Sequence, residues 1–134
     1  MALPGLDAAL RTLLVGSAPV TAIVGQKVYN LQAPASVALP YVIFYQASGV
    51  ISNSVPRDTL NHVFRVEARA SSGTGAITLA GAIYDALHEQ ELTLSGWSNY
   101  WMVVTNEMVF IENVDGVQYH RRVYDVRIKA SKNS

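Results

Sequence analysis

Three histidines offer this chain its widest choice of chemistry, because imidazole serves as a zinc ligand and as a general acid or base near neutral pH. His62, His88 and His120 are isolated, and His88-Glu89-Gln90-Glu91 lacks the second histidine of a His-Glu-x-x-His zinc motif. The chain contains no cysteine, which excludes disulfides, thiolate zinc sites and cysteine nucleophiles. A metal site would have to be assembled across the fold, so we expect neither a metal nor another cofactor.

A glycine-rich segment, Ser71 to Gly75, lies between a predicted strand and a predicted helix, where such a loop can hold a phosphate on the helix N-terminus. Thr78 stands where a dinucleotide fingerprint needs its third glycine, and no Gly-x-Ser-x-Gly serine hydrolase motif occurs. Glu107 with Glu112 or Asp125 would form a catalytic carboxylate pair only in a geometry that the sequence does not specify. We therefore interpret the loop as a plain turn and expect the chain not to be an enzyme.

Arginines near the C-terminus are interleaved with aromatic residues, as in a nucleic-acid groove. Arg121 and Arg122 lie between Tyr119 and Tyr124. On a strand, however, neighbouring side chains point to opposite faces, so the two arginines do not form one basic surface. This pattern favours a solvated or interface face over direct nucleic-acid contact.

Composition favours one folded domain that associates with other chains. Of the 134 residues, 50% are hydrophobic and only 15% are charged, against about a quarter charged in a typical globular protein. A monomer of this size ordinarily covers its surface with more charged groups, so we expect another subunit to cover part of it. We expect a single domain over residues 1–134, with 131–134 as a frayed tail.

Charge is balanced overall and sorted along the chain. Ten basic and ten acidic residues cancel, which removes the excess that non-specific binding to nucleic acid or anionic membranes needs. Residues 1–69, 70–116 and 117–134 carry net charges of +2, −6 and +4. Two interpretations remain open: cross-strand pairing inside one hairpin, or complementary patches on neighbouring copies in a ring or stack.

No segment is predicted to enter a membrane. The N-terminus has no positively charged region before its apolar stretch, which argues against a signal peptide. The longest stretch without charge, Val28 to Pro56, contains Pro34, Pro40 and many polar residues. It cannot form a transmembrane helix.

Hydrophobic periodicity predicts an α+β fold. An amphipathic helix over Leu6–Leu14 ends near Gly16, and a short helical turn from Ser17 to Gly25 follows it. A second main amphipathic helix, Ala76–Leu87, carries small residues that allow it to lie close on a sheet. Two main helices and one short helical turn should therefore pack on a mixed, mostly antiparallel sheet. Strands are predicted at Val28–Leu31, Pro40–Gln46, His62–Ala70, Glu91–Leu94, Trp101–Glu112 and Tyr119–Ala130.

The last two predicted strands form a hairpin. Asp115-Gly116 between two β-type runs indicates a two-residue turn. That turn places Val103 opposite Ile128 and Thr105 opposite Val126 on a common apolar face. In the predicted strand over residues 62–70, apolar residues alternate with charged residues on a face predicted to be wet: Arg65, Glu67 and Arg69.

Several segments, taken in order, resemble the siphophage tail-completion family, whose members are also called tail terminators. The likeness spans nearly the whole chain, and the ordered set of segments carries it rather than any one motif. Leu6–Leu14, Ala18–Gly25 and Lys27–Tyr29 are similar to the opening helix, the Pro-to-Gly turn and the first short strand of that family. Further similar segments are Leu39–Phe44, with its Leu-Pro-aromatic start, Ala76–Leu87, Asp115-Gly116 and Tyr119–Ile128.

The resemblance implies a structural virion protein that forms a hexameric ring at the head-proximal end of a phage tail tube. Such a ring stops tube polymerisation and offers a docking face to the head connector. Its partners would be further copies of itself, the tail tube protein and a connector or head-closure protein, while DNA passes through the lumen without being read. The implied location is the neck region of the virion tail, after assembly in the host cytoplasm. The alternatives are another neck component, such as a head-closure or connector adaptor, or a small metal-dependent hydrolase.

Interface residues can be suggested from loosely specified or aromatic segments. The polar stretch Ser48–Asp58 is interpreted as a long connecting loop, and Ser95–Trp101 is unusually aromatic for a chain resembling this family. Loops and exposed aromatic residues commonly form protein interfaces. The candidate interface residues are Arg57, Asp58, Trp97, Tyr100, Trp101, Arg121 and Arg122.

Overall fold

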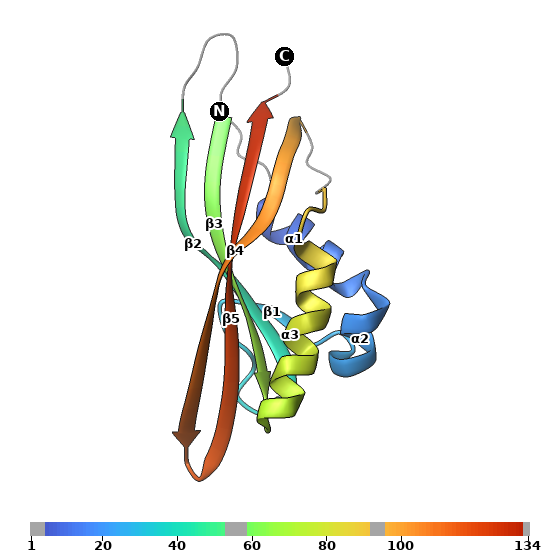
Figure 1. Cartoon of the computed structure of the whole chain (residues 1–134), viewed down its shortest axis with the longest axis vertical. Coiled ribbons are helices and arrows are strands. Elements are labelled where there is room, and N and C mark those ends of the chain that lie inside the picture. Colours follow the sequence, from blue (N-terminus) through green and yellow to red (C-terminus); the bar gives the residue numbers. More distant parts are fainter. Residues whose placement is uncertain (1–4, 53–58, 92–95, 133–134) are drawn as a thin grey trace.

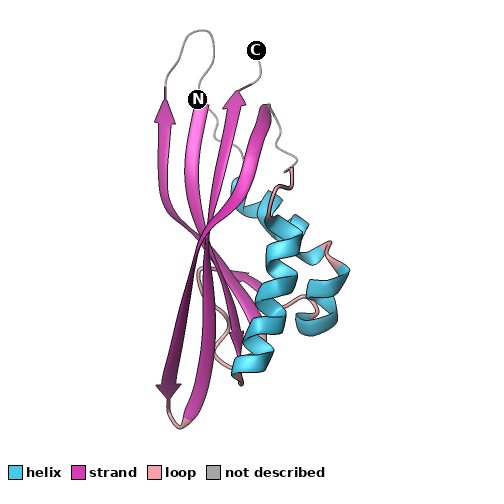
Figure 2. Ribbon diagram, viewed as in Figure 1, coloured by secondary structure: helices cyan, strands magenta, loops and turns pink. Residues whose placement is uncertain are grey.

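Three helices lie on one face of a five-stranded sheet in the part of the chain that the computed structural model describes, residues 5–52, 59–91 and 96–132 (Figures 1 and 2). This arrangement confirms the predicted α+β class. In chain order the elements are α1 (Leu6–Val15), α2 (Ala18–Val24), β1 (Val28–Asn30), β2 (Tyr41–Ser52), β3 (Thr59–Ala70), α3 (Gly73–Leu87), β4 (Trp97–Val114) and β5 (Val117–Lys132).

The sheet is mixed and mostly antiparallel, as predicted. Its strand order is β1-β2-β3-β5-β4, and only the β1–β2 pair is parallel. β3 and β5 form the centre and pair from Thr59 with Ser131 to Ala70 with His120. β4 is an edge strand, because its other side has no partner within the described residues.

The helices follow the predicted signals. α1 ends at Gly16, and α2 begins after Ser17 with proline in its first turn. α2 ends at Gly25, whose φ of 63° is a conformation that glycine adopts without steric cost. Among the described residues, no single helix is long and apolar enough to cross a membrane; α1 and α2 together meet the same criteria of length and composition, but they are bent by 83° where they join.

The core lies between the helices and the sheet. α1 and α3 each present one apolar stripe to the helix-facing side chains of β2, β3 and β5, so burial is concentrated in one layer. Fully burying one large apolar side chain contributes roughly 1.5–3 kcal/mol. The largest fully buried side chains include Leu10, Leu14, Phe44, Phe64, Leu79, Ile83, Leu87, Met102 and Ile128.

Two bulges lie at the same level of the sheet. The register shifts between Gln46 and Ser48 in β2 and between Val104 and Asn106 in β4, on either side of the central β3–β5 pair. A bulge adds one residue to a strand and increases the local twist. At this level the ribbons cross in projection, so the two ends of the sheet face different directions (Figure 1).

The β4 bulge corrects the predicted register. The Asp115-Gly116 turn is confirmed, and the pairs next to it follow from a two-residue loop. Both predicted pairs are wrong by one residue, because Thr105 is the extra residue of the bulge. A shift of one residue exchanges the two faces of a strand. The observed pairs there are Met102 with Ile128, Val103 with Arg127 and Val104 with Val126.

The strands are longer than predicted. β2 continues to Ser52, so the start of the predicted loop Ser48–Asp58 is strand, and residues 53–58 lie outside the described part. β5 continues through Lys132 into the segment predicted to be frayed. Of the strand predicted at Glu91–Leu94, only Glu91 is described, and it is not in a strand.

Candidate interaction surface

We call residues 107–124, the end of the β4–β5 hairpin, the hairpin arm, and its residues 112–119 project beyond β3. β3 ends at Ala70, which pairs with His120. Past that point β4 and β5 pair only with each other, up to Val114 opposite Val117. The arm extends furthest at the lower end of the sheet (Figure 2). Its tip therefore lacks the support of the central strand.

The hairpin arm exposes most of the large apolar side chains found on the surface. Of the eight exposed large hydrophobic residues in the described part of the chain, five belong to the arm, with exposed fractions from 42% to 62%. The other three are Leu31, on the β1 side of the sheet, and Ile77 and Tyr84 on α3. A concentration of this kind is typical of an interaction site, whereas scattered single residues are not. The five are Val109, Phe110, Ile111, Val114 and Val117.

These five side chains lie on both faces of the hairpin arm. Tyr124 faces the helices, since its ring centroid is 6.1 Å from that of Tyr84 on α3. Side chains alternate along a strand, and residues paired directly opposite share a face. Val109, opposite Arg122, and Ile111, opposite His120, therefore lie on the helix side. The remaining three, Phe110, Val114 and Val117, lie on the open side of the sheet, which carries no helix.

Charged residues of the arm pair with each other across the hairpin. On the helix side, Arg122 Nη1 lies 3.4 Å from Glu107 Oε1. On the open side, Arg121 Nη1 lies 3.4 Å from Glu112 Oε2. These contacts support the cross-strand interpretation of the sorted charge for these residues. Among the described ion pairs none involves Asp115 at the turn.

A buried carboxylate anchors the arm on the open side. Glu67 in β3 is 2% exposed, so the prediction that it faces water is wrong. Arg121 Nη2 lies 2.9 Å from Glu67 Oε1, and Arg69 Nη2 lies 3.1 Å from the same oxygen. Tyr45 Oη donates to Glu67 Oε2 at 3.3 Å. A buried charge needs such partners, and here side chains of β2, β3 and β5 supply them.

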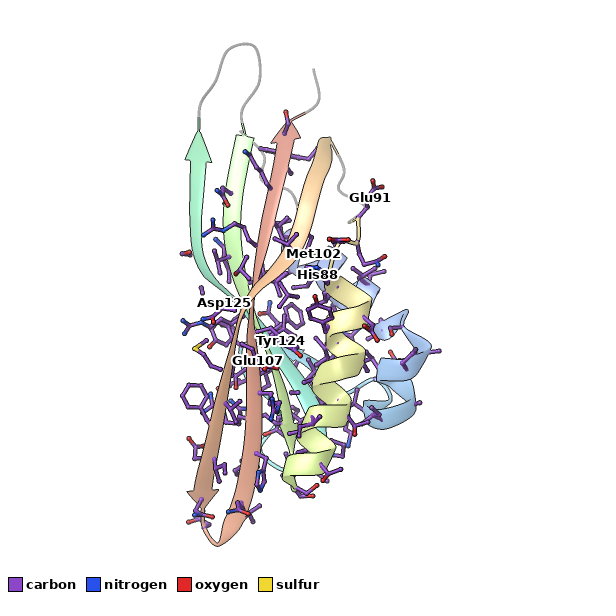
Figure 3. The ribbon with its side chains drawn as sticks, viewed as in Figure 1. His88, Glu91, Met102, Glu107, Tyr124 and Asp125 are labelled. Carbon is purple, nitrogen blue, oxygen red and sulfur yellow. The ribbon has the colours of Figure 1, made fainter. Side chains whose placement is uncertain are left out.

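Three side chains near the arm, Tyr124, Arg65 and Arg69, have pKa values shifted further from neutral pH. Burial, reinforced by Glu107, raises the pKa of Tyr124 to about 12 (Figure 3). The hydrogen bond from Arg65 Nε to Asp125 Oδ1, at 3.0 Å, raises the pKa of Arg65. Burial alone would lower the pKa of Arg69, but its interactions with Tyr41 and Glu67 outweigh that effect and raise it. The interactions of these three groups hold their side chains in place on the sheet.

The three histidines lie in two strands and at a helix end. His88 caps the C-terminus of α3, where its Nδ1 accepts from the Val104 backbone N–H at 3.1 Å. His88 therefore ties the end of α3 to β4. His62 is buried in β3, and its Nδ1 has no hydrogen-bond partner in the described part of the chain. His120 Nε2 lies 3.0 Å from Gln118 Oε1.

The glycine-rich segment tested for phosphate binding has a structural role. Ser72 is the N-cap of α3, and its hydroxyl accepts from the Gly75 N–H at 3.0 Å, as expected for a plain strand-to-helix turn. Among the described residues, no group of three or more His, Asp or Glu side chains is placed to hold a metal ion.

The predicted interface residues fall into three groups. Trp97 is 5% exposed and belongs to the core, which corrects its assignment to an interface. Arg121 and Arg122 are half-buried on opposite faces of the arm and are held by carboxylates of the same chain. Arg57 and Asp58 lie outside the described residues, as do the side chains of Tyr100 and Trp101, whose backbone is in β4.

Sequence reasoning missed the apolar residues of the hairpin arm. The run Met108-Val109-Phe110-Ile111 has no polar alternation, which indicates a strand that is apolar on both faces. That signal was present in the sequence. The exposure of the run depends on β4 being the edge strand of the sheet, and no local pattern in the run gives that.

Comparison with known proteins identifies the family. The family model described as "Tail completion protein gp17" matches residues 8–130. A solved structure described as "Virion of native gene transfer agent (GTA) particle" contains a chain with the same fold, at a TM-score of 0.77 and 22% sequence identity, and the alignment covers 94% of each chain. No curated protein matches the chain. The family match covers most of the sequence, and the chain therefore belongs to the tail completion protein gp17 family.

Proposed function

We propose that this protein is a tail terminator, a structural virion protein that forms a hexameric ring at the head-proximal end of a phage tail tube. The family match over residues 8–130 is the observation that carries the proposal. The ring stops tube polymerisation and offers a docking face to the head connector or head-closure protein. It assembles in the host cytoplasm and remains in the neck region of the virion.

The surface of the chain supports assembly. A ring is built from heterologous contacts, in which two different patches of each copy meet. Apolar residues exposed on both faces of the hairpin arm provide two such patches. Candidate residues Arg57, Asp58, Tyr100 and Trp101 are proposed to contribute to the contacts with neighbouring copies or with the tube.

DNA is proposed to pass through the ring without being read. Three arginines of the central strands are engaged within the chain: Arg65 with Asp125, Arg121 with Glu67, and Arg122 with Glu107. Sequence-specific binding needs side chains free to reach base edges. The central strands offer paired charges instead, which suits a lumen with little affinity for its contents.

Light scattering coupled to size exclusion tests the proposal, first on the protein alone and then on its mixture with tail tube protein. We expect a ring in one of the two samples, and phage lacking this protein should produce heads together with tubes of unregulated length. A strict monomer that leaves tube length unchanged would contradict the proposal. Capping of DNA-filled heads in place of tubes would assign the protein to another neck position.

A further inference from the structure

The edge strand of the hairpin arm carries three consecutive exposed apolar residues between its two glutamates. Natural edge strands are guarded by charges, prolines or short length. β4 is long, and the consecutive residues Val109, Phe110 and Ile111 on it are 56%, 44% and 62% exposed. A surface of this kind aggregates unless a specific partner covers it. The arm is therefore built to be covered.

The helix side of the arm continues onto α3. The start of α3 lies beside His120. A Cβ atom added at Gly73 would be 3.8 Å from His120 Nδ1. Further along the helix, the Tyr84 ring lies beside the Tyr124 ring. Ile77, two helical turns before Tyr84, thus lies next to the arm between these two points. Together with the two aliphatic residues of β4 on that face, these form what we call the helix-side patch: Ile77, Tyr84, Val109 and Ile111.

The opposite face of the same hairpin carries a different apolar group, which we call the open-side patch: Phe110, Val114 and Val117. The Arg121 guanidinium lies over the Phe110 ring, with 5.3 Å from Cζ to the ring centroid, which fixes the ring on this face. The two patches differ in composition and point in opposite directions. This is the arrangement that a head-to-tail contact requires.

We propose that neighbouring copies pack front to back through their arms, with the open-side patch of one copy against the helix-side patch of the next. The inference rests on the proposed ring function and names the contact that builds the ring. A second copy is the occupant because each chain carries both patches. The ion pairs of the arm are satisfied internally, so neither patch needs a charged partner.

The absence of cysteine permits a clean crosslinking test. Val117→Cys places a thiol on the open-side patch, and Ile77→Cys places one on the helix-side patch. Under oxidation of assembled rings, a mixture of the two variants should form covalent dimers, whereas each variant alone should form none above background. Mixing Val117→Cys with Leu31→Cys provides the matched control, since Leu31 is an exposed apolar residue outside both patches.

The outcomes separate this inference from the proposed function. Rings that form normally but show no Val117–Ile77 crosslink would overturn the inference and leave the tail terminator proposal standing. Efficient crosslinking of Val117→Cys with itself would mean that two open-side patches meet, which also overturns it. If wild-type protein forms no ring alone or on tubes, the proposed function fails first. A chain carrying both cysteines should give a covalent ladder whose last step counts the subunits.

A substitution in the open-side patch gives a second, independent test. Phe110→Asp would replace the ring with a charged carboxylate in an apolar contact and should weaken association by about tenfold or more. Phe110→Leu keeps the apolar contact and should still assemble. Both variants should unfold, as monomers, at the wild-type denaturant concentration, because Phe110 lies on the surface outside the core. Equal assembly of Phe110→Asp and Phe110→Leu would contradict the front-to-back contact.

Discussion

The helix-covered half of the sheet and the hairpin arm use the same residue types for opposite purposes. Phe64 in β3 and Phe110 in β4 both lie in antiparallel strands, yet Phe64 is fully buried under the helices and Phe110 is 44% exposed. The difference lies in the face that each side chain occupies, because Phe64 packs under the helices, whereas Phe110 lies on the open side of the edge strand β4, which carries no helix. Apolar side chains stabilise the chain in the first region and remain available to another chain in the second.

This contrast locates the surface that the low charge content predicts. Only 15% of the residues are charged, and the shortage is not spread evenly. Most of the exposed large apolar residues of the described chain gather on one hairpin. The comparison therefore predicts that substitutions in the covered half change folding, whereas substitutions in the arm change assembly.

The largest expected effect comes from Phe64→Ala. Truncating a fully buried phenylalanine removes its burial and leaves a cavity, which should lower the free energy of unfolding by about 3–5 kcal/mol. The matched variant Phe110→Ala should change it by less than about 1 kcal/mol. Urea denaturation at a concentration where the protein is monomeric measures both. Similar losses for the two variants would abolish the distinction between the two regions.

Glu67→Gln should have the next largest effect, because Glu67 joins the two regions. The substitution leaves Arg69 and Arg121 without their buried counter-charge, and breaking such a pair costs about 3 kcal/mol. Glu112, the other partner of Arg121, has a side chain that is 49% exposed. Glu112→Gln should therefore lower the free energy of unfolding by less than about 1 kcal/mol. Denaturant titration of the two variants measures the difference. A small loss for Glu67→Gln would show that solvent, not the carboxylate, compensates the arginines.

Tyr124, on the boundary between the regions, should make stability depend on alkaline pH. Its folded-state pKa of about 12 exceeds the unfolded value near 10, so below pH 10 the hydroxyl is protonated in both states. As the pH rises from about 10 to 12, the unfolded state loses this proton first, and roughly 2 kcal/mol of stability is lost. Tyr124→Phe should flatten the fall in that window, measured as unfolding free energy against pH. An unchanged slope would mean that burial of this hydroxyl does not perturb its ionisation.

Most elements could be predicted because the local sequence signals agree with one another. The stripes of α1 and α3, the proline and glycine around α2, and the Asp115-Gly116 turn all indicate what the structure contains. The register beyond the turn could not be predicted in the same way. Met102, Val103 and Val104 are all apolar, so alternation does not reveal that Thr105 bulges.

The candidate surface depended on long-range contacts that period-two alternation does not record. Alternation places Glu67 on a wet face, but Arg121, 54 residues away, covers it. Trp97 belongs to an aromatic segment that suggests an interface, yet it packs in the core. Both errors arise because burial is set by which distant segments arrive, whereas the sequence pattern reports only which side of a strand a residue occupies.

The smallest expected effect is that of the α3 cap, and it tests whether assembly through the arm depends on the N-terminus of α3. Ser72→Ala removes the hydroxyl that accepts from the Gly75 N–H. Because this N–H then loses its partner within the chain, the free energy of unfolding should fall by about 1 kcal/mol. Ser71→Ala, beside it and outside the cap, should cost less than about 0.5 kcal/mol. Thermal unfolding measures both. Assembly should be unchanged in Ser72→Ala, because the cap fixes the start of α3 and touches neither patch; a loss of assembly would mean that the arm relies on α3 for its position as well as for Ile77.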